Sequence, residues 1–132
     1  MTRILIVDSN GPGLPALGPG FAAVLQELSG SITCSLCAPY LGQALPDEVF
    51  DGVVFTGSAV TWCVDAPEGQ ALRDMWRQVT RWKVPIWGSC NGMQLAAFML
   101  GGICTASPHG DEEGLAEAIT LTEIGREHPM MQ

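Results

Sequence analysis

The segment Gly-Ser-Cys-Asn-Gly at 88–92 carries the clearest chemical signal in the chain, because a single cysteine lies between two glycines. Apolar residues typical of a strand precede it at 84–87, and residues with helical spacing follow at 93–100. A cysteine in so sharp a turn is crowded on both sides and has a strained backbone, so its neighbours two positions away must be small. The pattern therefore predicts a nucleophile elbow. Cys90 is its nucleophile, and the dipole of the helix N-terminus favours the thiolate.

The other four cysteines have no such flanking glycines. The Cys34-x-x-Cys37 spacing also occurs in redox pairs and zinc sites, but no second Cys/His pair at ligand spacing accompanies it. We therefore predict that Cys34, Cys37, Cys63 and Cys104 are small buried apolar residues. An odd total of five cysteines also argues against a disulfide framework. The acidic run at 111–113 is predicted to be a solvated loop rather than a cation site.

Length, composition and charge exclude several classes of function. The 132 residues have room for one domain, and no linker or internal repeat divides them. A net charge of −8 with six Lys and Arg argues against nucleic-acid binding. The apolar runs have the length of strands, and the first residues lack a signal-peptide pattern, so we expect a cytoplasmic protein that does not bind membranes. No cofactor is expected, and without a Walker-type phosphate loop any ATP chemistry would belong to a partner.

Strand and helix patterns alternate along the chain. Strands are predicted at 3–8, 31–36, 52–55 and 84–87, and helices at 21–28, 71–82 and 93–100. A further strand is predicted at 115–122, with a polar turn at 123–132. Such alternation favours parallel pairing with right-handed crossovers. The predicted fold is α/β, a flavodoxin-like three-layer α/β/α sandwich with a mostly parallel sheet and the nucleophile elbow.

In a fold of this kind, ligands bind beyond the carboxyl ends of the parallel strands. The loops at those ends are 8–10, 56–59 and 89–91, and the last of them contains Cys90. If the three strands are neighbours, the backbone N–H groups of Gly57 and Asn91 can form an oxyanion hole beside the sulfur. Such a hole stabilises the negative charge that develops on a carbonyl oxygen during acyl transfer to sulfur.

The pattern Gly-x-Cys-x-Gly-Met-Gln-Leu-Ala at 88–96, followed by Leu-Gly-Gly at 100–102, resembles the nucleophile segment of class I glutamine amidotransferases, the triad type. Residues 51–58 resemble the oxyanion strand and loop of that family. The stretches 110–114 (Gly-x-x-Glu-Gly) and 119–126 resemble the part that follows the nucleophile helix. The resemblance covers essentially the whole chain.

The resemblance implies an activity and a substrate. Cys90 would attack the side-chain amide of L-glutamine, form a glutamyl thioester and release ammonia to a synthetase domain or subunit. Gln94 and Ser58 would lie beside the bound glutamine, and Gly57 and Asn91 would supply the oxyanion donors.

Three departures from the family pattern stand out. The chain has Thr-Gly-Ser at 56–58 where the family more often has Gly-Gly-Pro, and Asn91 stands where a larger residue is common. Neither change removes a backbone donor. The third is that the family's catalytic His-x-Glu pair has no match, since His109 and His128 are predicted to be solvated loop residues. We therefore expect residues 1–132 to be a domain incomplete at its C-terminus, with the catalytic His and Glu on the remainder of the polypeptide.

Two other interpretations stay open. One is a different cysteine-elbow enzyme on the same sheet, such as a γ-glutamyl hydrolase or a peptidase-like or glyoxalase-like relative. The other is a non-catalytic module that binds glutamine or regulates a partner and keeps only the elbow.

Overall fold

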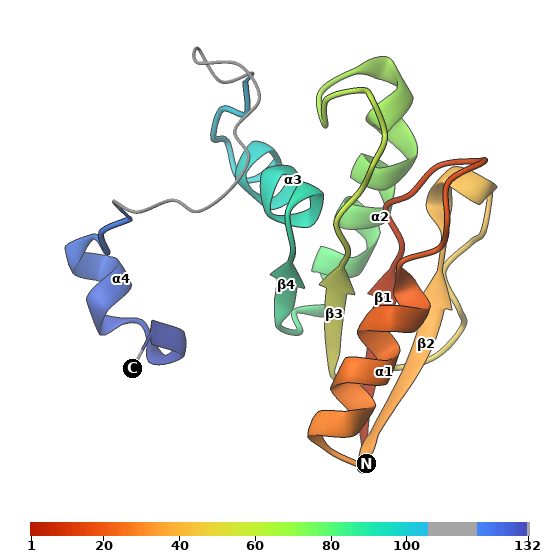
Figure 1. Ribbon diagram of the computed structural model, residues 1–132, viewed down its shortest axis with the longest axis horizontal. Helices are drawn as coiled ribbons and strands as arrows, with labels where there is room; N and C mark the ends of the chain where they lie inside the picture. The colour runs from red at the N-terminus through yellow and green to blue at the C-terminus, as the bar shows by residue number, and fades with distance from the viewer. Residues whose placement is uncertain (106–118, 132) are drawn as a thin grey trace.

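Strands and helices alternate in the structure as the apolar periodicity predicts (Figure 1). The computed structural model describes residues 1–105 and 119–131. The elements follow in the order β1 (Thr2–Val7), α1 (Gly18–Leu28), β2 (Ile32–Cys37), β3 (Gly52–Phe55), α2 (Gln70–Val79), β4 (Ile86–Gly88), α3 (Asn91–Met99) and α4 (Glu123–Glu127). Short 3₁₀ turns include η3 (Thr80–Trp82), which continues α2, and η4 (Pro129–Met131).

Within the described residues, four strands form one parallel sheet in the order β2-β1-β3-β4. At its carboxyl edge Val7 of β1 pairs with Phe55 of β3, and Phe55 pairs with Gly88 of β4. The loops that follow these three strands therefore meet at one edge of the sheet. The α/β class and the flavodoxin-like sandwich are confirmed.

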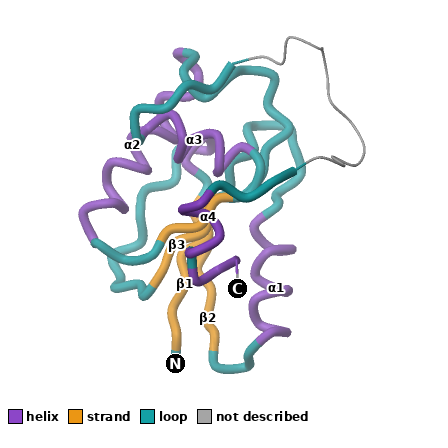
Figure 2. Tube along the Cα trace, turned by 90° about the vertical axis from the view of Figure 1, so that its left-hand side faces the viewer, coloured by secondary structure: helices purple, strands orange, loops and turns teal. Residues whose placement is uncertain are grey.

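Helices lie on both faces of the sheet (Figure 2). Helix α1 contacts β1 and β2 on one face, whereas α3 contacts β3, β4 and α2 on the other. Because strand side chains alternate between faces, the apolar runs of β1 and β3 are buried on both sides. The main core lies between the sheet and the α2 and α3 helices, and its fully or nearly fully buried members include Leu5, Val7, Val53, Phe55, Leu72, Met75, Val79 and Leu95.

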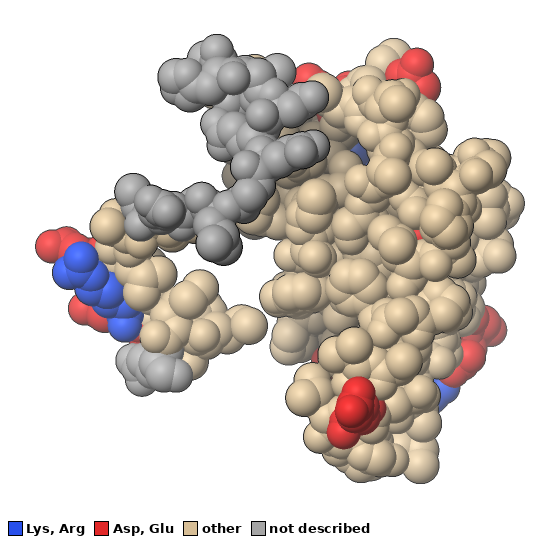
Figure 3. Space-filling view, viewed as in Figure 1, with Lys and Arg blue, Asp and Glu red and all other residues tan. Residues whose placement is uncertain are grey.

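The face that carries α1 has few charged side chains (Figure 3). Beside α1, over β3 and β4, it has an apolar groove of about 630 Å³. Val54 of β3, Trp87 of β4 and Met130 of η4 line the groove together with apolar residues of α1. The sheet beneath this groove is thus less completely covered than the sheet beneath α1.

Helix α1 begins three residues before its predicted start because of a contact that its own sequence does not reveal. The Asp8 carboxylate, at the end of β1, accepts hydrogen bonds from the N–H groups of Leu17 and Gly18, both at 2.7 Å. These groups would otherwise lack acceptors at the helix N-terminus. A buried carboxylate from a strand therefore determines where the helix starts.

The prediction for the C-terminal region was wrong in two respects. The strand predicted at 115–122 lies partly outside the described residues, and its described part, 119–122, is not a strand. The polar turn predicted at 123–132 contains helix α4, because the Thr122 hydroxyl accepts the N–H of Gly125 at 3.1 Å and caps the helix.

Candidate active site

Cys90 has the backbone geometry of a strained elbow. Its dihedral angles are φ 48° and ψ −106°, and it is the N-cap residue of α3. A positive φ is uncommon in a residue with a Cβ atom, and such a sparsely populated conformation costs about 1–3 kcal/mol. Strand β4 ends two residues earlier, at Gly88. The strand-turn-helix elbow predicted from the sequence is therefore present, and the Cys90 side chain is exposed at its tip.

Gly88 and Gly92 permit this turn because backbone lies where their side chains would be. A Cβ atom on Gly88 would lie 2.4 Å from the carbonyl carbon of Gly92. A Cβ atom on Gly92 would lie 2.6 Å from the carbonyl oxygen of Phe55. The turn is closed by hydrogen bonds from the Ser89 N–H to the Phe55 carbonyl, at 3.0 Å, and from the Gly92 N–H to the Ser89 carbonyl, at 2.8 Å. Strand, turn and helix thus pack with no room for a side chain.

The loop after β3 lies directly against the cysteine. A Cβ atom on Gly57 would be 3.4 Å from the Cβ atom of Cys90. Within residues 1–105 and 119–131, neither the N–H of Gly57 nor that of Asn91 donates a hydrogen bond to a protein acceptor. Two backbone donors beside an exposed thiol are the groups that an oxyanion hole needs.

The Ser9 backbone and the Asn10 side chain, in the loop after β1, hold the loop after β3 in place. The Thr56 hydroxyl accepts the N–H of Ser9 at 2.9 Å, and the Ser58 hydroxyl donates to the Ser9 carbonyl at 2.6 Å. Asn10 Oδ1 accepts the N–H of Ala59 at 2.8 Å. Sequence reasoning did not identify Ser9 and Asn10 as anchors, although two polar residues directly after a buried strand were a usable signal.

The remaining predicted substrate contact lies on α3. Gln94 is half-buried in the first turn, where its N–H donates to the Cys90 carbonyl at 3.0 Å. This bond places Gln94 in the first turn of α3, directly after the Cys90 elbow. Asn91 is buried, and its side-chain oxygen has no partner within the described part of the chain. The Ser58 hydroxyl, in contrast, is already bonded to the β1 loop.

Of the two histidines, His128 lies in the described part of the chain, and no contact there joins it to Cys90. His128 is exposed at the end of α4, and its Nδ1 atom accepts the N–H of Met130 at 3.2 Å within the same turn. Its predicted solvation is confirmed. His109 and the acidic residues at 111–113 lie outside the described residues.

The other cysteines differ from one another in exposure. Cys37 is buried as predicted, Cys34 and Cys104 are half-buried, and Cys63 is exposed, so the prediction of burial was wrong for Cys63. Cys63 lies in the loop between β3 and α2, beyond the apolar core. Burial raises the pKa of both the Cys34 and the Cys37 thiols, which lowers their thiolate fraction at neutral pH.

We expect Cys90 to react first when the folded chain is treated with a small excess of iodoacetamide at neutral pH. Cys90 combines exposure with a helix N-terminus, whereas Cys63 is exposed without one. Cys34 and Cys37 should react last because their pKa values are raised. Mass-spectrometric mapping of alkylated peptides over time gives the order. Faster labelling of Cys37 than of Cys90 in folded protein would contradict the elbow chemistry.

The described residues contain neither a candidate metal site nor a helix that could span a membrane. No group of three His, Cys, Asp or Glu side chains among them could hold a metal ion. The helices in the same part of the chain are all too short or too polar to cross a bilayer.

Comparisons of the chain with protein-family models, with curated proteins and with solved structures find no match.

Proposed function

We propose that the chain is a glutaminase domain of the class I glutamine amidotransferase type, and that Cys90 attacks the side-chain amide of L-glutamine. The observation that carries this proposal is the strained Cys90 backbone, at φ 48° and ψ −106°, with Gly57 packed against its Cβ atom. Strain of this kind is retained where a reactive side chain must be held in one position. We assign the activity to the cytoplasm on the sequence grounds given above.

In the proposed reaction, the Cys90 sulfur adds to the amide carbon of glutamine, and the carbonyl oxygen becomes an oxyanion. The N–H groups of Gly57 and Asn91 donate to that oxygen. The carbon–nitrogen bond then breaks, and the nitrogen takes a proton and leaves as ammonia. Water adds to the resulting thioester and releases glutamate and the free thiol. Gln94 lies on the helix face that borders the substrate.

Ammonia can leave only if a general acid protonates the nitrogen, and the thioester needs a general base to activate water. Such catalysis is commonly worth about 10²- to 10⁴-fold. We assign both roles to the His and Glu expected on the polypeptide that completes the site, and the ammonia to a synthetase partner. The described residues support the nucleophile and the oxyanion donors of this scheme.

The test is covalent labelling of Cys90 by a chloroketone analogue of L-glutamine. We expect a labelling rate that saturates with reagent concentration, and protection by L-glutamine but not by D-glutamine. Cys90→Ser should abolish the labelling, whereas the matched control Cys63→Ser, at another exposed thiol, should leave it unchanged. The measurement is the rate of adduct formation by intact-protein mass spectrometry.

The outcomes separate this proposal from the alternatives. Protection by γ-glutamyl peptides in place of free glutamine would indicate a γ-glutamyl hydrolase. Binding of glutamine with no adduct at Cys90 would indicate a non-catalytic module. Linear, unprotected labelling of a folded chain would contradict the proposed function.

A further inference from the structure

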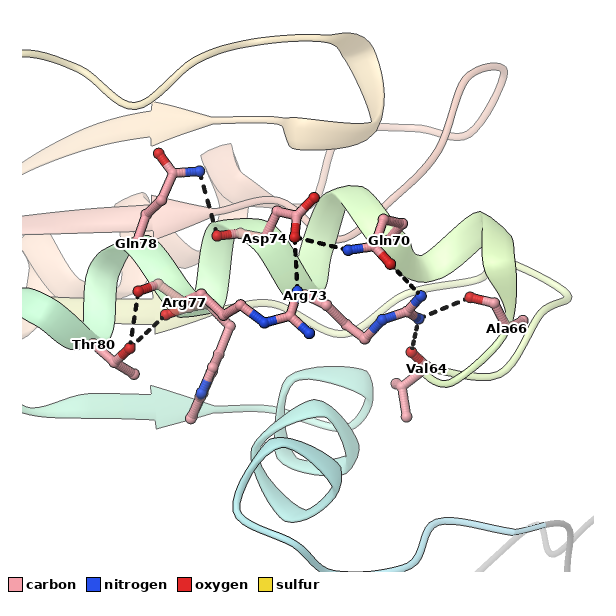
Figure 4. Close-up of polar contacts among 9 residues, drawn as sticks. Val64, Ala66, Gln70, Arg73, Asp74, Arg77, Gln78 and Thr80 are labelled. Atoms are coloured by element: carbon pink, nitrogen blue, oxygen red, sulfur yellow. Dashed lines mark hydrogen bonds and ion pairs between the residues drawn. The ribbon is translucent and has the colours of Figure 1, made fainter.

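Arg73 is a buried cation on α2, only 7% exposed (Figure 4). Its Nη1 atom donates to the carbonyl oxygens of Val64 and Ala66, the latter at 2.7 Å, and its Nη2 atom donates to Gln70 Oε1 at 2.9 Å. No carboxylate pairs with it among the residues that the structure describes. Because burying a charge is costly, such a group persists when polar acceptors offset the loss of water, and three neutral oxygens do so here.

Gly69 leaves the space that this arrangement needs. A Cβ atom at Gly69 would lie 2.8 Å from Arg73 Nη1 and 2.8 Å from the Val64 carbonyl oxygen. Val64 is itself 3% exposed and packs into the core. The backbone at 64–66 is therefore held by its side-chain packing and by the guanidinium fork.

The segment held by Arg73 is the far end of the loop that begins at Gly57. At the near end, Gly57 packs against Cys90, and Asn10 binds the N–H of Ala59. Between the two ends, Trp62 donates its ring N–H to the Tyr40 hydroxyl at 3.2 Å. Only residues 60–63 separate the near anchor at Ala59 from the far anchor at Val64, so the two ends of the loop are joined by a short stretch of backbone.

We propose that Arg73 is a positioning residue for the active site, which holds the 57–66 loop so that the N–H of Gly57 faces the oxyanion. This rests on the function proposed above. Arg73 acts through the backbone of the loop and does not contact the substrate. A lysine cannot reproduce the planar fork that reaches two carbonyls and an amide together.

The test compares two reagents on Cys90 of the full chain. The Cys90 sulfur adds to the carbonyl carbon of the glutamine chloroketone, which places negative charge on the carbonyl oxygen beside the oxyanion donors, and then forms a thioether as chloride leaves. With iodoacetamide the sulfur displaces iodide directly, and no oxyanion forms. In Arg73→Met we expect the chloroketone rate to fall about 10- to 100-fold, because small misplacements of a reacting group have effects of that size. The iodoacetamide rate should stay within about twofold. Arg73→Lys should recover part of the loss.

The matched control is Arg77→Met, which removes an exposed arginine of the same helix whose partner is Asp74, at 2.7 Å. It should leave both rates unchanged. Equal losses of both rates in Arg73→Met, or no loss of either, would overturn the proposal. If Arg73→Met does not fold, Arg73→Lys and Gly69→Ala perturb the same fork and give the same readout.

Deuterium uptake by the backbone amides of 57–66 separates this inference from the proposed function. Faster exchange in the Arg73 variants than in Arg77→Met supports the proposal that Arg73 holds this loop, and unchanged exchange overturns it. If the wild-type chain reacts no faster with the chloroketone than with iodoacetamide, the proposed function is contradicted. The deuterium uptake then tests by itself whether Arg73 holds the 57–66 loop.

Discussion

Alanine at Gly88 or Gly92 is expected to lower the free energy of unfolding by about 3 kcal/mol or more, the largest stability effect that we predict. The new Cβ atoms would lie 2.4 Å and 2.6 Å from backbone atoms of α3 and of β3, respectively. Backbone cannot move aside as the end of a side chain can, so strand β4 and helix α3 would have to separate. Urea denaturation of each purified variant measures the loss.

The matched control for these variants is Gly20→Ala. Gly20 lies inside α1, and a Cβ atom there would meet nothing within 4 Å. Alanine in a helix is favoured over glycine by about 0.5–1 kcal/mol, so this variant should be as stable as the wild type or more so. Wild-type urea midpoints for Gly88→Ala and Gly92→Ala would show that the elbow is less tightly packed than described.

Proline at Gly57 is expected to slow the reaction of Cys90 with the glutamine chloroketone by about 10²- to 10³-fold, the loss typical of one missing oxyanion donor. The N–H that proline removes has no protein acceptor in the described part of the chain, so the fold loses no hydrogen bond. The measurement is the labelling rate of Cys90 at saturating glutamine chloroketone. The sulfur is alkylated and chloride leaves, so this readout reports the oxyanion of the tetrahedral adduct and needs neither the release of ammonia nor the hydrolysis of a thioester.

Gly57→Ala is the control because it adds a Cβ atom 3.4 Å from that of Cys90 but keeps the N–H. It should label within a few-fold of the wild type. Equal losses in the alanine and proline variants would assign the effect to crowding of the sulfur. Undiminished labelling in Gly57→Pro would exclude Gly57 as a donor.

The elements that the sequence predicted well depend on local rules. The strand at 52–55 is an unbroken apolar run between turn residues, and its predicted bounds are those of β3. The elbow could be predicted because its pattern, a cysteine between two glycines, lies within five residues, although the atom that Gly92 must leave room for is the Phe55 carbonyl oxygen of β3. The proximity of Gly57 to Cys90 and Asn91 could be predicted because the carboxyl ends of neighbouring parallel strands meet at one edge of the sheet.

The polar contacts that complete the site could not be predicted in this way. Asp8 caps a helix nine residues further on, Asn10 binds a loop 49 residues away, and Arg73 reaches back to carbonyls of an irregular segment. Such hydrogen-bond partners depend on how the elements pack in three dimensions, and the apolar periodicity of the sequence does not predict them. The exposure of Cys63 could not be predicted for a similar reason, because the exposure of a loop side chain depends on the path of the loop.

The strand order also has a consequence for the newly made chain. β1 is synthesised first but lies in the interior of the sheet, between β2 and β3. Its Ile4 pairs with Cys34 on one side and with Gly52 on the other. Once β2 has emerged from the ribosome it can protect one edge of β1, while the other edge keeps unpaired backbone groups until β3 follows. Non-local pairing of this kind makes folding slow, and we expect the nascent chain to expose an unpaired strand edge to aggregation or to chaperones in the interval before β3 emerges.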